Sequence, residues 1–364
     1  MLKKRPDPVS FALSLLLYAG MLLALLLPDR AVSYSERRAL SQYPAPSART
    51  LWSGAWASGV ERWLPDQFPF REPLRALAMR FRLHTLALSD YKGVYTAGGS
   101  AAQSLYPLHE ENVLRTARRA TEIAQTYYPT ARTAAALIPD KSMLLPQSGR
   151  PVANFAAMER AFFAAFTGAR IPLADLLTAD DYYATDVHWR QERLHDVAAR
   201  IAGAYGAPLE PTDDTSHVYA PFYGGYYARQ TGLSPDALVY LTNDVIRAAA
   251  ETGPARSASP APIYDASLLS GMDAYDVFLY GASPFLTVQN ARPAISARDR
   301  TLVVFRDSFA SSLAPLLLPA YETLVLVDLR YLAVSALPDL LPAGDCDVLF
   351  LFSAATVNAG AMLR

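Results

Sequence analysis

The longest apolar stretch of the chain covers residues 9–27 and follows a basic cluster. Its 19 residues include no charged side chain, and Lys3, Lys4 and Arg5 precede it. A helix needs about 20 apolar residues to cross the hydrocarbon layer of a bilayer. The pattern predicts a transmembrane helix, and the basic residues favour an orientation that places the rest of the chain outside the cytoplasm. A cleaved signal peptide is the alternative, but the run exceeds the usual length of about 7–15 residues and no clear cleavage site follows.

Beyond residue 105, apolar positions switch between helical spacing and short continuous runs. Helical spacing is found in four segments, residues 112–128, 154–166, 189–205 and 309–318. Continuous apolar runs, typical of strands buried on both faces, are found at residues 133–138, 301–305, 323–328 and 348–352. Strands that alternate with helices in this way predict an α/β fold whose parallel sheet is flanked by helices on both faces.

The segment between the apolar run and residue 105 shows no clean period. It contains five prolines and three tryptophans, which indicates a membrane-proximal lead-in that packs through its aromatic side chains. These patterns divide the chain into a short cytoplasmic tail with a transmembrane anchor over residues 1–28, a lead-in over 29–105 and a main domain over 106–364. Within the main domain, the small, Pro-rich residues 249–263 are expected to form an exposed loop.

Composition narrows the classes of function. The 364 residues are 52% hydrophobic and 18% charged, which suits a chain with a large core and not a disordered one. A net charge of −1 supplies no positive field for phosphates, so nucleic-acid binding is not expected. The single cysteine, Cys346, lies in an apolar run and is expected to be an inert core thiol. The histidines lack metal-ligand spacing, so neither a metal nor a cofactor is expected.

The first candidate chemical site is an Asp-x-His-Trp segment directly before a predicted helix. In an extended segment, residues i and i+2 point to the same side, so the Asp186 carboxylate could reach the His188 ring. That contact would fix the ring tautomer and stabilise the imidazolium form. Trp189 points the other way and could brace the segment. A purely structural role for the pair stays open from the residues alone.

The second candidate site is the junction at residues 303–310, where an apolar strand runs into Asp-Ser and a helix begins at once. Ser308 is thereby expected at the carboxyl end of a strand and at a helix N-terminus, where open α/β sheets bind ligands. Its own backbone N–H could donate to a developing oxyanion. The alternative is a helix cap, because Asp and Ser are favoured N-cap residues.

Several separated motifs together resemble a known family. They lie in the same order along the chain at residues 35–40, 66–71, 93–95, 185–189, 222–227, 307–310 and 328–331. The sequence resembles the DHHW protein family and, more distantly, the alginate O-acetylation proteins, both SGNH hydrolase-like. The resemblance implies that Asp186 and His188 act as acid and base and that Ser308 is the nucleophile. Val187 departs from the family signature, which has a histidine there, although the alginate relatives tolerate another residue.

A second departure concerns the oxyanion site. Relatives often carry a Gly-Asn pair within the segment that corresponds to residues 275–284, and here Ala282 stands at the Asn position. Loss of one oxyanion donor can lower the rate by about 10²–10³-fold. The remaining candidates are the backbone N–H of Gly281 and the hydroxyl of Ser283, and a turn without catalytic part is the alternative. Tyr226, Trp189 and Arg306 are candidate substrate contacts.

The resemblance and the candidate triad predict an extracytoplasmic O-acyltransferase or esterase that acts on a cell-envelope or exported polysaccharide. The transferase is favoured by the alginate resemblance, which also implies a multi-span membrane acyltransferase as the partner that supplies the acyl group. Two non-enzymatic alternatives stay open: a glycan-binding or scaffold protein that kept the fold without turnover, and a structural partner in an envelope assembly. Acid pairs at residues 180–181 and 213–214 are interpreted as turn residues and not as a glycosidase pair.

Overall fold

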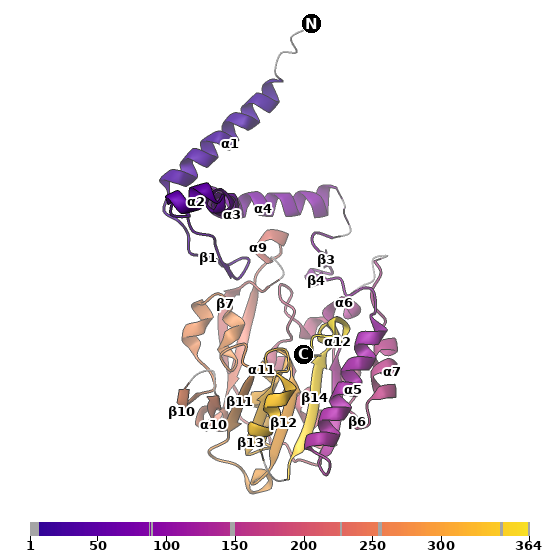
Figure 1. Ribbon diagram of the computed structural model, residues 1–364. Helices are drawn as coiled ribbons and strands as arrows, with labels where there is room; N and C mark the ends of the chain where they lie inside the picture. The colour runs from indigo at the N-terminus through magenta and orange to yellow at the C-terminus, as the bar shows by residue number, and fades with distance from the viewer. Residues whose placement is uncertain are drawn as a thin grey trace. The chain divides into compact units, whose positions relative to one another are not determined.

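Figure 1 shows a computed structural model of the chain, which describes residues 7–86, 88, 90–145, 150–225, 228–253, 257–342 and 345–362. The chain forms two compact units. The first comprises Met1–Leu88 with Tyr227–Gly232, and the second comprises Ser89–Tyr226 with Leu233–Arg364. The predicted boundary near residue 105 remains a prediction.

The second unit is built on one large sheet. Among the described residues, eight strands pair in the order β10 (Ser257–Pro262), β9 (Ala250–Gly253), β11 (Phe285–Gln289), β13 (Thr323–Val327), β12 (Thr301–Arg306), β14 (Asp347–Ser353), β5 (Arg132–Ile138) and β6 (Ala169–Arg170). The five strands from β13 to β6 are parallel. The other three are antiparallel at one edge. The α/β class is confirmed, and the sheet is mixed where a parallel one was expected.

One expected loop proved to be part of this sheet. Residues 249–263 were predicted to form an exposed loop, but the described part of the segment contains β9 and β10. Strand β9 pairs with β11, the strand that adjoins the parallel part of the sheet. Small residues and prolines are tolerated where strands lie toward the edge of a sheet. Strands β9 and β10 therefore form because their backbone pairs with neighbouring strands, and not because of an apolar sequence pattern.

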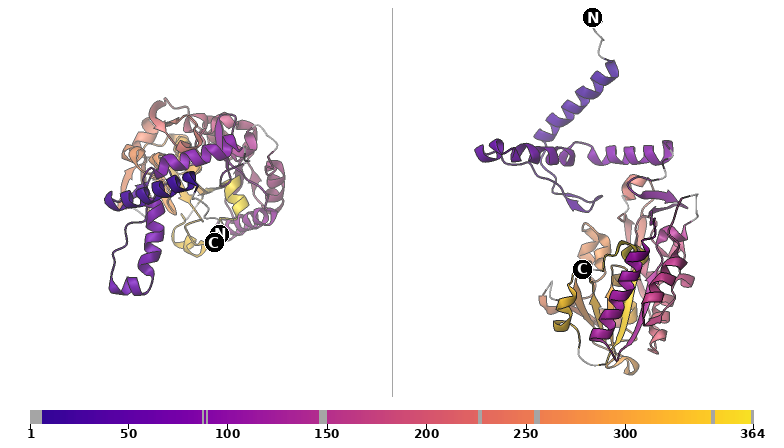
Figure 2. Two further views of the ribbon diagram at one scale, coloured as in Figure 1. Left: turned by 90° about the horizontal axis from the view of Figure 1, so that it is seen from above. Right: turned by 45° about the vertical axis from the view of Figure 1, so that its right-hand side comes forward.

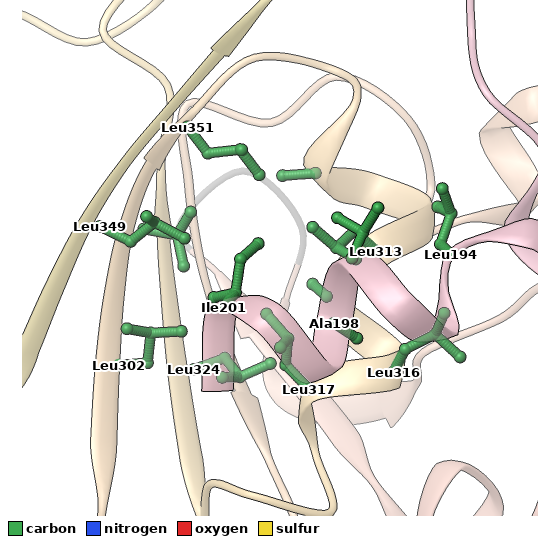
Figure 3. Packing of buried hydrophobic residues seen from close by; sticks show 14 of the residues in the cluster. Leu194, Ala198, Ile201, Leu302, Leu313, Leu316, Leu317, Leu324, Leu349 and Leu351 are labelled. Carbon is green, nitrogen blue, oxygen red and sulfur yellow. The ribbon is translucent and has the colours of Figure 1, made fainter. Parts of the chain in front are cut away.

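Two helical layers cover the two faces of the sheet. Successive strand residues point to opposite faces, so Leu302, Leu324 and Leu349 share one face while Val303, Val325 and Val348 share the other. Helices α8 (His195–Ala204) and α11 (Ala310–Leu317) pack on the first face, as Figure 3 shows. The second face is covered by α5 (Glu110–Tyr127), α7 (Phe155–Ala165) and α12 (Ala354–Ala359). The core is thus two apolar layers with the parallel strands between them.

Smaller elements complete the second unit. Its described part also contains β3 (Val94–Ala97), β4 (Ser100–Gln103), α6 (Lys141–Leu144), β7 (Thr215–Phe222), β8 (Asp236–Thr242), α10 (Asp244–Ala248) and several single-turn 3-10 helices. Strands β7 and β8 form an antiparallel pair. Phe222 and Leu238 from this pair join Tyr183, Tyr275 and Phe278 in a separate aromatic cluster.

The first unit contains the apolar helix and, up to Leu88, the segment for which no period was found. Its described elements are α1 (Pro8–Leu26), β1 (Val32–Ser33), β2 (Arg38–Ala39), α2 (Ala48–Trp52), α3 (Ala55–Gln67), α4 (Arg71–Arg80), a π-helical turn (Phe81–Thr85) and α9 (Ala228–Thr231). Helix α1 has a mean hydropathy of 2.3 and is long and apolar enough to cross a membrane. The tryptophans do not all pack as expected, since Trp63 is buried but Trp52 is 96% exposed.

Candidate active site

The Asp-x-His segment lies in a tight loop. Tyr182 and Trp189 pair as an antiparallel bridge, and the backbone N–H of Tyr183 donates to the His188 carbonyl. The chain must therefore turn between these residues, and Asp186 accepts the backbone N–H of His188 at 3.0 Å. The carboxylate and the ring meet as expected, but through a turn and not along an extended strand. Helix α8 consequently begins only at His195, after a 3-10 turn over Gln191–Arg193.

Ser308 lies between the end of β12 and the start of α11 and is partly exposed. Asp307, the residue before it, is buried and accepts the N–H of Phe309 at 3.1 Å and that of Ser353 at 2.8 Å. The first bond closes the turn that presents Ser308, and the second ties this turn to the end of the neighbouring strand β14. Asp307 therefore has a positioning role that the sequence analysis did not identify.

The three candidate residues form one hydrogen-bonded chain. Asp186 Oδ1 lies 2.6 Å from His188 Nδ1, and His188 Nε2 lies 2.8 Å from Ser308 Oγ. Because Nδ1 faces a carboxylate, it carries the ring proton, and Nε2 is left to accept the proton of the Ser308 hydroxyl. Asp186 is 1% exposed and His188 8% exposed, so bulk water screens neither charge well. This arrangement can activate a serine for attack on an ester carbonyl.

Aromatic rings hold the imidazole in this position. The His188 ring stacks on Tyr275 with 4.0 Å between ring centroids and 10° between planes. Phe309 contacts the imidazole with a centroid distance of 5.1 Å. The Tyr275 hydroxyl donates to Ser312 Oγ at 2.8 Å, which fixes the tyrosine, and burial raises its pKa well above the ordinary value. The ring of His188 is therefore confined between two faces before any substrate binds.

A buried lysine holds the loop of Asp186. Lys141 follows β5 and is 1% exposed, and its Nζ lies 2.6 Å from the Tyr183 carbonyl, 3.2 Å from that of Ala184 and 2.8 Å from that of Asp186. Burial lowers the pKa of Lys141 to about 8, against the opposing effect of nearby carboxylates, of which Asp186 contributes most. The sequence analysis missed this residue. The only available signal was its place directly after a buried strand.

Two further groups fix the same loop from the side of β7 and β8. Asp236, the first residue of β8, accepts the N–H of Ala184 and both the N–H and the hydroxyl of Thr185 at 2.6–2.9 Å. Gly225 donates its N–H to Asp186 Oδ2 at 2.7 Å. Both oxygens of the Asp186 carboxylate are thereby bonded, so its orientation toward His188 is set by its surroundings.

Gly224 is the point of closest approach to this loop. Its N–H donates to Thr185 Oγ1 at 3.1 Å, and a Cβ atom at this position would collide with the Thr185 carbonyl oxygen and with the Asp186 side chain. A Gly224→Ala variant must therefore displace Asp186. We expect its kcat/KM for ester hydrolysis to fall by about 10²-fold, the usual effect of a misplacement near 1 Å. Gly203→Ala in helix α8, where a Cβ meets nothing within 4 Å, is the control and should keep full activity. Equal activity of both variants would contradict the prediction.

The expected oxyanion donors are mostly committed elsewhere. Gly281 donates its N–H to the Phe278 carbonyl at 3.2 Å, and Ser283 donates its hydroxyl to the Phe285 carbonyl at 2.9 Å. Gly281 has φ of 82°, and a Cβ there would collide with Asp276, so its glycine is required by the turn. Neither residue is placed to receive an oxyanion in this structure. Among the described residues, none accepts a hydrogen bond from the Ser308 backbone N–H, which remains the candidate donor.

The expected substrate contacts are corrected by burial. Trp189 is fully buried and donates its Nε1–H to the Phe309 carbonyl at 2.9 Å and to Ser312 Oγ at 3.0 Å. Arg306 is 1% exposed and donates to Ser311 Oγ at 2.9 Å. Both brace the turn that carries Ser308, and both side chains are buried in this structure. Tyr226, the third candidate, lies outside the described residues.

Metal ligands and acid pairs give no second site. Among the described residues, no group of three His, Cys, Asp or Glu side chains gathers to hold a metal ion. Asp181 caps a 3-10 turn by accepting from Thr178 at 2.8 Å. Asp214 accepts hydrogen bonds from His195 at 2.7 Å and from Asn243 at 2.8 Å, where a solvated turn acid was expected.

The cysteine is a separate case. Burial raises the pKa of the Cys346 thiol to about 11.

Solved structures share this fold. A DHHW family protein from Eubacterium siraeum is 17% identical with a TM-score of 0.62, over 76% of this chain and 96% of that one. Bacillus cereus PatB1 is 16% identical with a TM-score of 0.56, over 72% and 96%, and was also solved with a sulfonyl adduct. The O-acetyltransferase domain of Pseudomonas putida AlgJ is 14% identical with a TM-score of 0.43, over 73% and 92%.

The first two of these neighbours match the resemblance expected from the sequence, and at such identities the likeness shows a common α/β fold. Scans of the sequence against protein-family models and against curated proteins find no match.

Proposed function

We propose that this chain is a serine-dependent O-acyltransferase or esterase, with acetyl as the transferred group and Ser308, His188 and Asp186 as its catalytic residues. The observation that carries the proposal is the continuous chain of hydrogen bonds, 2.8 Å from Ser308 to His188 and 2.6 Å from His188 to Asp186. Helices and loops from distant parts of the sequence converge to make it. A helix cap at Ser308 or a structural Asp-x-His pair would not require that convergence.

The reaction proceeds in two halves. Ser308 Oγ attacks the carbonyl carbon of an ester while His188 Nε2 takes the hydroxyl proton, and the oxyanion is stabilised by the Ser308 N–H. The tetrahedral intermediate collapses, the alcohol leaves with the proton from His188, and an acyl-serine remains. An acceptor hydroxyl or water then attacks this ester as His188 takes its proton, and collapse returns the proton to Ser308. Asp186 stabilises the imidazolium form in both halves.

The acceptor that we propose is a cell-envelope or exported polysaccharide. Support comes from the sequence resemblance and from helix α1, which would anchor the chain in the membrane with the catalytic unit outside the cytoplasm. An acyl donor outside the cytoplasm would require a partner that exports it, and a multi-span membrane acyltransferase is the proposed partner. In this proposal residues 1–28 form the tail and anchor, residues 29–105 the lead-in and residues 106–364 the catalytic domain.

One observation favours a second candidate function. The Gly281 N–H and the Ser283 hydroxyl are both bonded to other carbonyls, and Ala282 has no amide. An oxyanion site with a single donor would be slow, because each lost donor costs about 10²–10³-fold in rate. The alternative is therefore a glycan-binding or scaffold protein that keeps the triad without turnover.

Covalent labelling distinguishes the two functions. We expect phenylmethylsulfonyl fluoride to modify the peptide that contains Ser308, and p-nitrophenyl acetate to release a burst of p-nitrophenol equal to the enzyme concentration. Mass spectrometry of the digested protein and stopped-flow absorbance are the measurements. A protein that binds oligosaccharides calorimetrically, yet shows neither label nor burst, would support the scaffold function and contradict the enzyme.

A further inference from the structure

A row of large apolar side chains is exposed along one side of helix α4 and the turn that follows it. Phe70 is 73% exposed, Leu74 49%, Leu77 65% and Phe81 50%. These four residues, which we call the apolar stripe, stand at i, i+4, i+7 and i+11. At about 100° per residue, Leu74, Leu77 and Phe81 fall within one narrow arc of the helix, and Phe70 is the residue directly before its first turn. A contiguous row of this kind, unlike single exposed apolar residues, marks an interaction surface.

The opposite side of the same helix is fixed by burial and charge. Met79 is fully buried, and Arg71 is 8% exposed. Arg71 forms ion pairs with Glu36 and Glu72, and Arg75 pairs with the same Glu36. The helix therefore cannot roll to bury the apolar stripe without breaking the two ion pairs with Glu36. The exposure of the stripe is a property of the folded unit and not of a loosely attached helix.

The apolar stripe begins beside the end of helix α1. Gly20 of α1 lies so close to the Phe68 ring that a Cβ at this position would sit 2.5 Å from the ring carbon Cζ. Leu23, Ala24 and Leu27 line a cavity together with residues 67–70. The first residue of the stripe thus stands next to the last turns of an apolar helix that is exposed to its surroundings along almost its whole length.

Figures 1 and 2 show how the backbones of helices α1, α3 and α4 are arranged. In both side views α3 and α4 lie in one layer, and α1 leaves that layer. The last turns of a helix that spans a bilayer lie at the interface between hydrocarbon and head groups. Amphipathic helices with Phe, Leu and Trp on one face bind in the plane of that interface. Trp52, which is 96% exposed in the same unit, is a residue type enriched there.

We propose that the apolar stripe inserts into the outer leaflet of the membrane, so that helix α4 lies in the lipid interface beside the end of α1. The occupant of this surface is lipid, because the stripe continues the apolar surface of α1 at the level where that helix leaves the bilayer. Exposed Arg80 and Arg82 flank the stripe and suit anionic head groups. The inference rests on α1 spanning the membrane and is independent of the triad.

Spin labelling of the full chain tests this placement. The protein carries Cys346→Ser and one new cysteine, Leu77→Cys, is labelled with a nitroxide and is reconstituted in phosphatidylcholine vesicles that contain phosphatidylglycerol. We expect collisions with molecular oxygen to exceed collisions with a water-soluble nickel chelate at Leu77→Cys. Leu16→Cys in α1 is the lipid reference. Ile295→Cys is the matched control, since Ile295 is apolar and 85% exposed but lies outside the stripe, and its label should be accessible to nickel.

Each other outcome has one meaning. A label at Leu77→Cys that is open to nickel, while that at Leu16→Cys is in lipid, overturns the inference and leaves the anchor in place. A label shielded from both reagents shows that protein, such as a second copy, covers the stripe, and it also overturns the inference. A label open to nickel at Leu16→Cys overturns the anchor and the inference together. Circular dichroism of each variant reports folding, and ester turnover in the same vesicles reports the proposed function, which can fail without affecting this inference.

Discussion

Replacing Ser308 by alanine is expected to lower kcat/KM for p-nitrophenyl acetate by about 10⁴-fold or more while the folded structure persists. The variant removes the hydroxyl that forms the acyl intermediate in the proposed mechanism. His188 keeps its bond to Asp186 and its stacking on Tyr275, so the rest of the site should stay in place. Initial rates of p-nitrophenol release and thermal unfolding of both proteins are the measurements.

Ser283→Ala is the matched control for this substitution. The sequence analysis named the Ser283 hydroxyl as a candidate oxyanion donor, but in the structure this hydroxyl donates to the Phe285 carbonyl. Its loss should leave kcat/KM close to that of the unchanged protein. If Ser308→Ala and the unchanged protein hydrolyse the ester equally, Ser308 is not the nucleophile. If Ser283→Ala shows the larger loss, the oxyanion role of Ser283 must be reconsidered.

Replacing Lys141 by methionine is expected to reduce both turnover and stability. Methionine keeps much of the volume but takes the Lys141 donor away from the carbonyls of Tyr183 and Asp186, while the Ala184 carbonyl keeps its bond from the Ala101 N–H. A buried acceptor that loses its partner costs about 1–3 kcal/mol, so the free energy of unfolding should fall by about 2 kcal/mol or more. The loosened loop carries Asp186, and kcat/KM should fall by about 10²-fold. Lys92→Met, at an exposed lysine, is the control for the change of side chain.

The pH dependence separates a positioning role from a merely structural one. The lysine is an ammonium with three N–H groups below its folded-state pKa of about 8, and a neutral amine with two N–H groups above it. One of the three carbonyls therefore loses its bond from Lys141 as the pH rises. We expect kcat/KM to decline above pH 8 in the unchanged protein, and this decline to be absent in Lys141→Met. A decline of the same size in both proteins would assign it to another group.

The buried parallel strands could be predicted because their pattern has one interpretation. Residues 302–305 and 348–352 are apolar at every position, which suits a strand covered on both faces, and β12 and β14 contain those residues. Strands β9 and β10 could not be predicted, since pairing with β11 and not an apolar run makes them. In the first unit, Pro65 lies inside α3 and Pro73 lies in the first turn of α4. Because proline usually ends a helix, the sequence did not indicate these two helices, although a first-turn position and tertiary contacts allow proline there.

In the candidate site, residues within short sequence motifs could be predicted, whereas residues whose contacts depend on the fold could not. Asp186, His188 and Ser308 could be predicted because each belongs to a short motif with a recognisable chemistry. Lys141 could not, because a single lysine after a strand acquires its role only when strand order brings that strand end beside the loop. Trp189 and Arg306 were assigned to substrate because they adjoin the motifs, but neighbours in sequence can point into the core.

The path of the chain after β7 couples the two units by covalent connection. Gly225 bonds the Asp186 carboxylate, and only two residues later the chain enters Tyr227–Gly232, which belongs to the unit of helix α1. The chain then returns to the second unit and forms β8, whose first residue, Asp236, bonds the other side of the Asp186 loop. If helix α1 anchors the first unit as proposed, any mechanical load on that unit would be transmitted along both arms of this excursion to the carboxylate that contacts His188.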